Sequence, residues 1–515
     1  MNAFWVTLSA SVILILSIAS LPLLNNNNAN HFTFADLLSW RSCSFLNEVA
    51  DLLVTNGTIY TSDDTLPFAD SMAIRNGRIL RVGSYSFTKA LTRPWTKELN
   101  LDGKIVVPGF IDSHVHFIPG GLQMARVELR GVNTKDLFVD KIRKAVAKPT
   151  GLLIDSAMKL VLPHIPDASV DERREALLRA SDHALKRGVT TVVDFGRYFP
   201  GSLPEYPWQD FSDVYKWADL SGNMMTRVCL FFPMETWPRL VDLMSKSGRV
   251  LSQWIYLGGV KAFADGSLGS NSALFHEPYA DDPNNYGLQV VDLDGLYNMT
   301  LSSDKSGLQV SIHAIGDRAN ELVLDMYASL VSEKRNRDRR FRIEHAQHLA
   351  PGTVARFGEQ SLIASVQPDH LLDDADSATK KLGSERAERG AYLFKSLLTN
   401  NAQLAFGSDW PVVDINPLKS IRTSMKRIPP HWEKAWIPSE CLCLKDALKA
   451  YTISAAHACF LDKYVGSLSP GKYADFVVLS TSSWEDLATE VSADVEATYV
   501  GGSMAYSIKP DVKRE

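Results

Sequence analysis

Eight apolar segments of strand length recur along the middle of the chain, and several end in a polar or ionisable residue. Helical patterns separate several of them; residues 170–188, for example, place Leu177, Ala180 and Ala184 on one face. Alternating strands and helices indicate an α/β fold, and eight strands close a (β/α)8 barrel. The segments are KIVVPGFIDSHVH, VTTVVDFG, TRVCLFFP, LGGVKAFAD, LQVSIHAIGD, FRIEHAQ, LIASVQPDH and QLAFGSDW.

The two ends of the chain have a different pattern. Near the N-terminus, DLLVTNGTIYTS and SMAIRNGRILRVGS are short strands, each broken by an Asn-Gly pair that favours a tight hairpin. ADFVVLS and ATYVGGSMAYS near the C-terminus are again strand-like. These patterns predict a small composite β-sandwich built from residues 47–106 and 465–515, around a barrel at 107–464. A long interval after the first barrel strand predicts an insertion near 117–170 that shapes the substrate pocket.

Composition excludes several classes of protein. Hydrophobic residues make up 45% of the 515-residue chain and charged residues 22%, which is typical of globular proteins and excludes disordered, collagen-like and coiled-coil chains. The formal net charge is −5, so no basic face that neutralises many phosphates is expected, and nucleic acid is not an expected partner. Five irregularly spaced cysteines predict neither a disulfide framework nor a zinc knuckle.

Residues 3–24 carry no charge and are long enough to cross a hydrocarbon layer of roughly 30 Å. Residues 1–30 therefore form either a membrane anchor or a cleaved signal peptide, with Ser17-Ile18-Ala19 as an acceptable cleavage site. We expect the protein at the endoplasmic-reticulum or perinuclear membrane, or in the secretory pathway if the segment is cleaved. Asn56 and Asn298 begin Asn-x-Ser/Thr triplets that are compatible with glycosylation.

Ionisable residues recur at the ends of the expected barrel strands. His114 and His116 stand two residues apart at the end of the first strand, so their side chains point to the same face. His313 ends the fifth strand, His345 the sixth and Asp409 the eighth. Buried imidazoles and carboxylates are costly unless they are paired or bind metal. The recurrence therefore predicts a metal site at one end of the barrel.

Lys261 lies in the fourth expected strand, beside Val260 and Phe263. An ammonium group directed into a barrel should pair with a carboxylate or lose its proton. One interpretation is an ion pair with Asp265 or another acid of the barrel. The other is a neutral amine that reacts with carbon dioxide and gives a carbamate able to bridge two cations.

The chain resembles the amidohydrolase superfamily, specifically the amidohydrolase-3 group that includes N-substituted formamide deformylase-like enzymes. The resemblance covers residues 47–510 and implies a distorted (β/α)8 TIM barrel with a composite β-sandwich. With its hydrophobic N-terminus, the chain is similar to plant members of this group, including those of far-red light signalling. The motifs that carry the resemblance are PGFIDSHVH, GGVKAFADGSLGS, HAIGDRA, RIEHAQ, SVQPDH, GSDWPV and YTISAAHACFLDKYVGSLSPGKYADFVVL.

The resemblance implies a centre with two divalent metal ions. The first pair of histidines would hold the more buried ion, a carboxylated lysine would bridge the two ions, and the later histidines would hold the second. Zinc is the expected metal, and manganese or iron would also suit these ligands. The implied ligands are His114, His116, Lys261, His313, His345 and Asp409.

The resemblance further implies hydrolysis of a C–N bond in a small amide, such as an N-substituted formamide, by a hydroxide that bridges the metals. Asp409 would accept the proton of the attacking water and deliver it to the leaving nitrogen. His370, at the end of the seventh strand, would hydrogen-bond the substrate carbonyl oxygen or only orient a loop. His348 is expected to be a structural residue. The alternative function is a membrane-associated signalling or scaffold protein of the plant far-red light response, and a homo-oligomer is left open.

Overall fold

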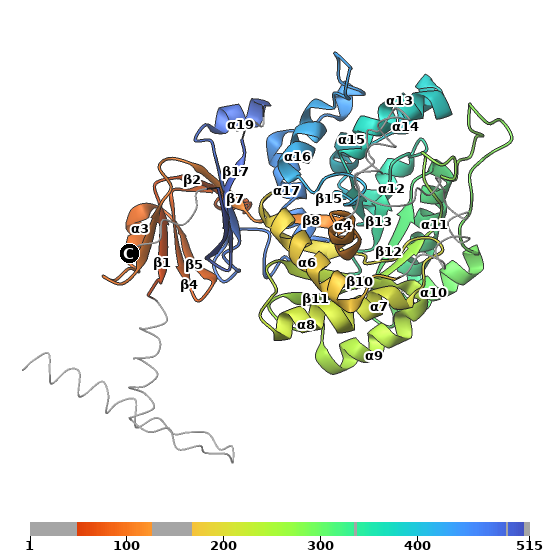
Figure 1. Cartoon of the computed structure of the whole chain (residues 1–515). Helices are drawn as coiled ribbons and strands as arrows, with labels where there is room; N and C mark the ends of the chain where they lie inside the picture. Colours follow the sequence, from red (N-terminus) through yellow and green to blue (C-terminus); the bar gives the residue numbers. More distant parts are fainter. Residues whose placement is uncertain (1–48, 126–166, 334–336, 491–492, 509–515) are drawn as a thin grey trace, which may run out of the picture. The chain divides into compact units, whose positions relative to one another are not determined.

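A sheet of eight parallel strands lies at the centre of the protein, with helices packed around its outside (Figure 1). The computed structural model describes residues 49–125, 167–333, 337–490 and 493–508, and the chain from Ala50 onward is one compact unit. The predicted α/β barrel is thus confirmed. Its strands are β8 (Phe110–Val115), β9 (Val189–Asp194), β10 (Arg227–Pro233), β11 (Ile255–Phe263), β12 (Gln309–Ala314), β13 (Arg342–His345), β14 (Ile363–Val366) and β15 (Gln403–Phe406).

Hydrogen bonds between the end of β8 and the segment after β15 close the barrel. The amide of Asp409 donates to the His114 carbonyl across 2.7 Å, and the amide of His116 donates to the Trp410 carbonyl across 2.8 Å. Val115 and Trp410 form a parallel bridge between these segments. Closure therefore places Asp409 next to both histidines of the first strand.

The helices follow the strands in the order that the sequence predicts. The helix expected at residues 170–188 begins after Ser169, whose side chain forms a capping box with Glu172, and the chain leaves it through Gly188 at a φ of +78°. The helices around the barrel are α4 (Phe117–Gln123), α6 (Val170–Leu185), α7 (Glu205–Asp210), η3 (Phe211–Tyr215), α8 (Lys216–Leu220), η4 (Met234–Thr236), α9 (Trp237–Ser247), α10 (Leu293–Lys305), α11 (Asp317–Glu333), α12 (Thr353–Glu359), α13 (His370–Leu382), α14 (Ser384–Gly390), α15 (Phe394–Thr399), α16 (Pro417–Lys426), η5 (Pro438–Glu440), α17 (Leu444–Ala450) and α18 (Ile453–His457).

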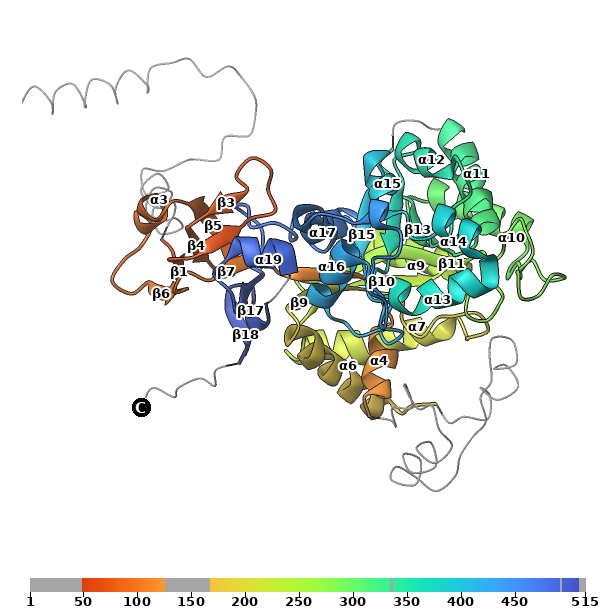
Figure 2. The same ribbon diagram turned by 90° about the horizontal axis from the view of Figure 1, so that it is seen from above.

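Two further sheets lie beside each other, and the larger one combines strands from both ends of the chain, whereas the smaller one contains N-terminal strands alone (Figures 1 and 2). One sheet has the order β5-β4-β1-β6 and the other β18-β17-β16-β7-β2-β3. They share a core that includes Val54 and Ile74 from the first sheet and Phe476 and Val478 from the second. The strands and flanking helices are β1 (Leu52–Thr55), β2 (Thr58–Tyr60), β3 (Phe68–Ala69), β4 (Ser71–Arg75), β5 (Arg78–Gly83), α3 (Tyr85–Lys89), β6 (Lys97–Asn100), β7 (Ile105–Pro108), β16 (Phe476–Leu479), α19 (Trp484–Glu490), β17 (Val495–Val500) and β18 (Ser503–Ser507).

The local pattern is misleading at two places. Asn76-Gly77 forms the expected hairpin between β4 and β5, but Asn56-Gly57 does not, because β1 pairs within one sheet and β2 within the other. The segment KIVVPGFIDSHVH is also two strands, β7 and β8. Gly109 separates them, and a Cβ there would lie 2.3 Å from the Thr190 hydroxyl oxygen. The boundaries between the predicted domains stay a prediction, and residues 126–166 of the expected insertion lie outside the described residues.

The predicted membrane attachment requires correction. No helix in the described ranges is both long and apolar enough to cross a bilayer. The longest described helix, α11, has 17 residues and spans about 26 Å, which is less than the roughly 30 Å of a hydrocarbon layer. On this finding, the prediction of a transmembrane helix that attaches the protein to a membrane is wrong. Residues 3–24, on which that prediction was based, lie outside the described residues.

Candidate metal centre

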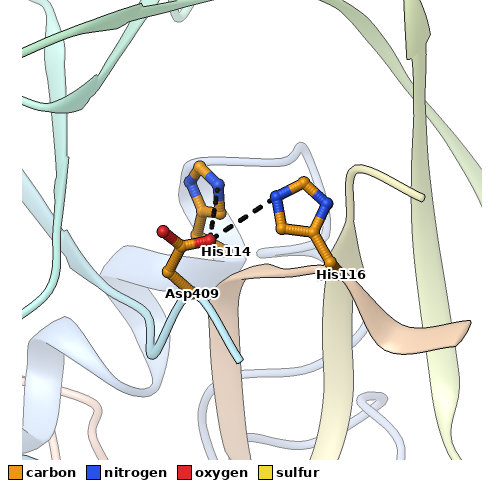
Figure 3. Close-up of side chains that lie close together, drawn as sticks. All are labelled: His114, His116 and Asp409. Atoms are coloured by element: carbon orange, nitrogen blue, oxygen red, sulfur yellow. Dashed lines mark ion pairs between the residues drawn. The ribbon is translucent and has the colours of Figure 1, made fainter. Parts of the chain in front are cut away.

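Two histidine rings and one carboxylate converge at the carboxyl end of the barrel strands (Figure 3). His114 Nε2 and His116 Nε2 each lie 3.5 Å from Oδ1 of Asp409. This Oδ1 is buried and has no hydrogen-bond partner within the described part of the chain. Three such groups, with ligand atoms within 4.8 Å of one another, form a candidate metal site.

A second candidate group shares the same carboxylate. His345, His370 and Asp409 also present ligand atoms within 4.8 Å of one another. The His313 ring lies beside His345, with 4.4 Å between ring centroids. The structure therefore brings the strand-end histidines of β8, β12 and β13 together, and it adds His370 to the cluster as a possible ligand rather than only a contact to substrate.

Each of the four predicted histidine ligands has one ring nitrogen next to a protein oxygen. A nitrogen that donates its proton to such an acceptor fixes the tautomer and leaves the other nitrogen unprotonated, which is the form that binds metal. This arrangement fits a metal centre. The pairs are His114 Nδ1 and Glu344 Oε2 (2.7 Å), His116 Nδ1 and the Gly196 carbonyl (2.6 Å), His313 Nε2 and the Gly266 carbonyl (3.0 Å), and His345 Nδ1 and Gln367 Oε1 (2.8 Å).

Burial keeps these imidazoles neutral. Burial, together with the positive charge of Lys261, lowers the pKa of His116 to about 4 and that of His313 to about 3. The pKa values of His114 and His345 also lie well below the ordinary value, chiefly because of burial. Neutral rings with a free nitrogen are available to a cation without first losing a proton.

Lys261 lies inside the barrel with its Nζ buried and without a hydrogen-bond partner among the described residues. The Nζ is 4.5 Å from the ring centroid of Phe195 and 5.2 Å from that of Phe263. Burial lowers the Lys261 pKa to about 8, although Glu344 and Asp409 oppose this shift. A lysine with a pKa near 8 is partly neutral at physiological pH and therefore nucleophilic.

Asp265, the acid that the sequence suggested as a partner for Lys261, is engaged elsewhere. Its carboxylate accepts hydrogen bonds from the amides of Leu274, Ile315 and Gly316 at 2.8–2.9 Å. The Asp265 carboxylate thus ties the ends of β11 and β12 together. No ion pair joins it to Lys261 in the described structure.

Two of the candidate ligands have an unusual backbone. His345 has a φ of +74° and Asp409 a φ of +56°, the left-handed region that side chains other than glycine rarely adopt. Such conformations cost on the order of 1–3 kcal/mol and are concentrated at functional sites. In this protein they occur where the chain turns away from β13 and β15.

Sequence reasoning missed the charged pair behind the cluster. Arg342 Nε donates to Glu344 Oε1 across 2.7 Å, and the Ser311 hydroxyl donates to the same oxygen across 2.6 Å. Burial would raise the pKa of Glu344, but Arg342 and His114 hold it well below the ordinary value. The available signal was the period of two in Arg-Ile-Glu-His, which directs Arg342 and Glu344 to the same face of β13.

An aromatic wall borders the cluster. The Phe263 ring centroid is 5.3 Å from that of His313, and Tyr198 lies 5.3 Å beyond Phe263. The Tyr198 hydroxyl lies 2.9 and 2.8 Å from the two carboxylate oxygens of Glu235. Phe263 and Tyr198 are thus two buried aromatic rings in series beside His313.

Comparison with known proteins finds related sequences. A sequence profile described as the amidohydrolase family matches residues 97–149 and 139–506. Protein LONG AFTER FAR-RED 3 of Arabidopsis thaliana is 55% identical, with 97% of each chain covered. N-substituted formamide deformylase of Arthrobacter pascens is 22% identical, covering 90% of this chain and 99% of that one.

The fold is also found among solved structures. An uncharacterized metal-dependent hydrolase from Pyrococcus furiosus superposes with a TM-score of 0.69 at 24% identity, covering 84% of this chain and 99% of that one. At this identity the likeness shows the fold alone. The sequence profile extends over most of the chain, and the relative at 55% identity over 97% of it. From these matches together, the chain belongs to the amidohydrolase family.

Proposed function

We propose that the protein is a metal-dependent hydrolase that cleaves the C–N bond of a small amide, such as an N-substituted formamide. The convergence of His114 Nε2 and His116 Nε2 on Asp409 Oδ1 carries this proposal. A scaffold has no physical need for buried imidazoles whose free nitrogens converge on a carboxylate oxygen. The distant similarity to N-substituted formamide deformylase supports this substrate class.

The same side chains provide a place for two divalent ions, for which we propose zinc. His114 and His116 would hold one ion, His313 and His345 the other, and Lys261, carboxylated at Nζ, would bridge them, with Asp409 as a further ligand. When bound, such ions polarise a carbonyl group and lower the pKa of water. The buried Lys261 Nζ has no hydrogen-bond partner among the described residues, and this supports the carbamate. Carboxylation would turn the amine into an anionic carbamate, and the two metal ions would balance its charge.

Asp409 would move the proton. Its carboxylate accepts a proton from the water that attacks the carbonyl carbon, and it returns this proton to the nitrogen as the C–N bond breaks. The products are a carboxylic acid, which is formic acid from a formamide, and an amine. Apolar substituents on the nitrogen would pack against Phe263 and Tyr198.

His370 would hydrogen-bond the substrate oxygen. Gln347 Nε2 lies 3.3 Å from His370 Nδ1, and the Ser408 backbone is also close enough to the His370 ring to raise its pKa. We propose the tautomer in which Gln347 donates to Nδ1 and the His370 proton is on Nε2. His370 Nε2 has no hydrogen-bond partner among the described residues. A protonated Nε2 is a donor, so we assign His370 to the substrate carbonyl oxygen rather than to a metal ion.

Far-red light signalling is the second candidate function, favoured by the 55% identity with Protein LONG AFTER FAR-RED 3. The two functions are compatible, because a signalling protein can also be an enzyme. They differ in what they require of Asp409: hydrolysis needs this carboxylate, whereas a scaffold needs only the fold.

A single purification separates these functions. The metal content of the full chain is measured by elemental analysis, and amine release is followed with a panel of N-substituted formamides and other small amides. We expect up to two divalent ions per chain and turnover of at least one amide. A fully metal-loaded protein that hydrolyses none of them would contradict the proposed activity and leave the signalling function.

A further inference from the structure

A small pocket lies among the loops that follow three of the ligand-bearing strands. Phe275 follows β11, Asp317 begins the helix after β12, and His348 follows β13, while Arg386 comes from α14. The interior of the pocket admits only about one particle of the size of water.

His348 faces this pocket without a partner. The side chain is 2% exposed, and neither ring nitrogen has a hydrogen-bond partner in the described ranges. Burial and, to a smaller extent, the charge of Arg386 lower the His348 pKa to about 3, so the ring is neutral at physiological pH. A neutral imidazole carries one N–H donor that buried surroundings normally satisfy.

Arg386 presents a second unsatisfied group. Its Nη1 donates to the Pro278 carbonyl across 2.9 Å, and its guanidinium carbon lies 5.1 Å from the Phe275 ring centroid. The Nε and Nη2 atoms are buried and have no hydrogen-bond partner among the described residues. These two atoms form one edge of the guanidinium plane, whose parallel N–H groups suit an anion.

The charges around the pocket favour a negative guest at this edge. The nearby Glu277 carboxylate is 3.7 Å from Nη1, which is not part of the unsatisfied Nε–Nη2 edge. Asp317 lines the pocket, but its Oδ1 accepts the His276 amide across 2.9 Å. Arg389 adds a second guanidinium to the lining. The groups without a hydrogen-bond partner are therefore the Nε–Nη2 edge of Arg386 and the imidazole of His348. The Arg386 edge is positively charged and can only donate hydrogen bonds.

We propose that this pocket binds one halide-sized anion, chloride, between the Nε and Nη2 groups of Arg386 and the ring N–H of His348. A chloride ion is somewhat larger than a water molecule and fits after a small movement of the lining side chains, whereas a carboxylate or phosphate with a substituent is much too large for the space. Chloride accepts several hydrogen bonds in any direction and tolerates the edge of the Phe275 ring. The bound anion joins α14 to loops that follow β11, β12 and β13, the strands of Lys261, His313 and His345.

Thermal unfolding of the full chain tests the proposal. The melting temperature is measured in sodium chloride and in sodium gluconate at equal ionic strength. We expect a saturating rise of about 1–2 °C in chloride. Arg386→Gln should lose this rise, and Arg239→Gln, which removes an exposed guanidinium of α9 that pairs with Glu205 at 2.9 Å and does not line the pocket, should keep it.

A crystallographic measurement covers the case in which Arg386→Gln fails to fold. Wild-type crystals grown in bromide should give an anomalous peak within hydrogen-bond distance of Arg386 and His348. Equal melting temperatures in the two salts, or a bromide-free pocket in those crystals, would overturn the proposal and indicate a water site. Neither measurement depends on bound metal or on hydrolysis, so failure of the proposed enzyme activity leaves this test intact.

Discussion

Glu344 accepts a hydrogen bond from His114 across 2.7 Å, and both side chains are buried. The acceptor fixes the ring so that Nε2, rather than Nδ1, faces Asp409. Arg342 neutralises the carboxylate from the other side at 2.7 Å. The orientation of one candidate ligand thus depends on a charged pair that touches no substrate.

Changing Glu344 tests this dependence. In Glu344→Gln an oxygen remains to accept from His114, but the charge that makes the imidazole a stronger ligand is lost. We expect metal affinity to fall by about 10–100-fold. Competition with a chromophoric chelator measures this. Glu321→Gln, which removes a carboxylate that hydrogen-bonds the exposed His276, is the control and should bind metal normally. Unchanged affinity in Glu344→Gln would show that the orientation does not depend on this carboxylate.

Asp409→Asn separates metal binding from proton transfer. The amide keeps an oxygen for the metal but can no longer carry the proton, so most metal should remain while hydrolysis falls by roughly 10²–10⁴-fold. Elemental analysis and amine release are measured on the same sample. Asp414→Asn, which breaks a surface pair with Arg187, should leave both unchanged. Wild-type hydrolysis by Asp409→Asn would remove this carboxylate from the mechanism.

Lys261→Ala should lose metal and activity because it removes the nitrogen that forms the proposed carbamate. Short carboxylic acids, such as acetate or propionate, fit the space of the deleted side chain and should restore part of both. Metal content is measured with and without added acid. If the variant stays fully active without any acid, Lys261 does not bridge the ions.

The stability of the metal-free protein should depend on pH through His348. Burial lowers the His348 pKa to about 3, so between pH 6.5 and 3 the unfolded chain binds a proton that the folded chain does not. The free energy of unfolding is therefore unaffected by His348 above pH 6.5, and it decreases as the pH falls from 6.5 towards 3 because the unfolded chain takes up the proton. At pH 5 the loss amounts to about 2 kcal/mol.

Urea unfolding at pH 7 and pH 5, at fixed chloride concentration, checks this. His348→Asn does not titrate, so it should lose less stability on acidification than the wild type. His431→Asn changes an exposed histidine and should behave as the wild type does. An equal loss in all three proteins would contradict the assignment.

The barrel and the position of its candidate ligands could be predicted because both follow from local sequence. Each strand is a short apolar run, and a polar residue at its carboxyl end must lie at the same face as the others. His114, His313, His345 and Asp409 occupy such positions and do lie together. Their roles as ligands stay a prediction.

The partners that orient these ligands could not be predicted in the same way. Gly196 and Gly266 accept hydrogen bonds from histidines through backbone carbonyls, which every residue has, so no residue type marks them. The Asn56-Gly57 pair shows a related limit. A turn motif specifies the local backbone but not which strand the next segment will pair with.

The pairing of β7 with β16 has a consequence for synthesis of the protein. Pro108 and Phe476 are partners in the sheet, and the chain between them contains the whole barrel. At a translation rate of roughly 5–20 residues per second, β7 leaves the ribosome on the order of 20–70 s before its neighbour exists. During that time its edge is open to other chains. We therefore expect this edge to need shielding by the translation machinery or by chaperones, and a message truncated before β16 would leave only β7, β2 and β3 of the six-stranded sheet.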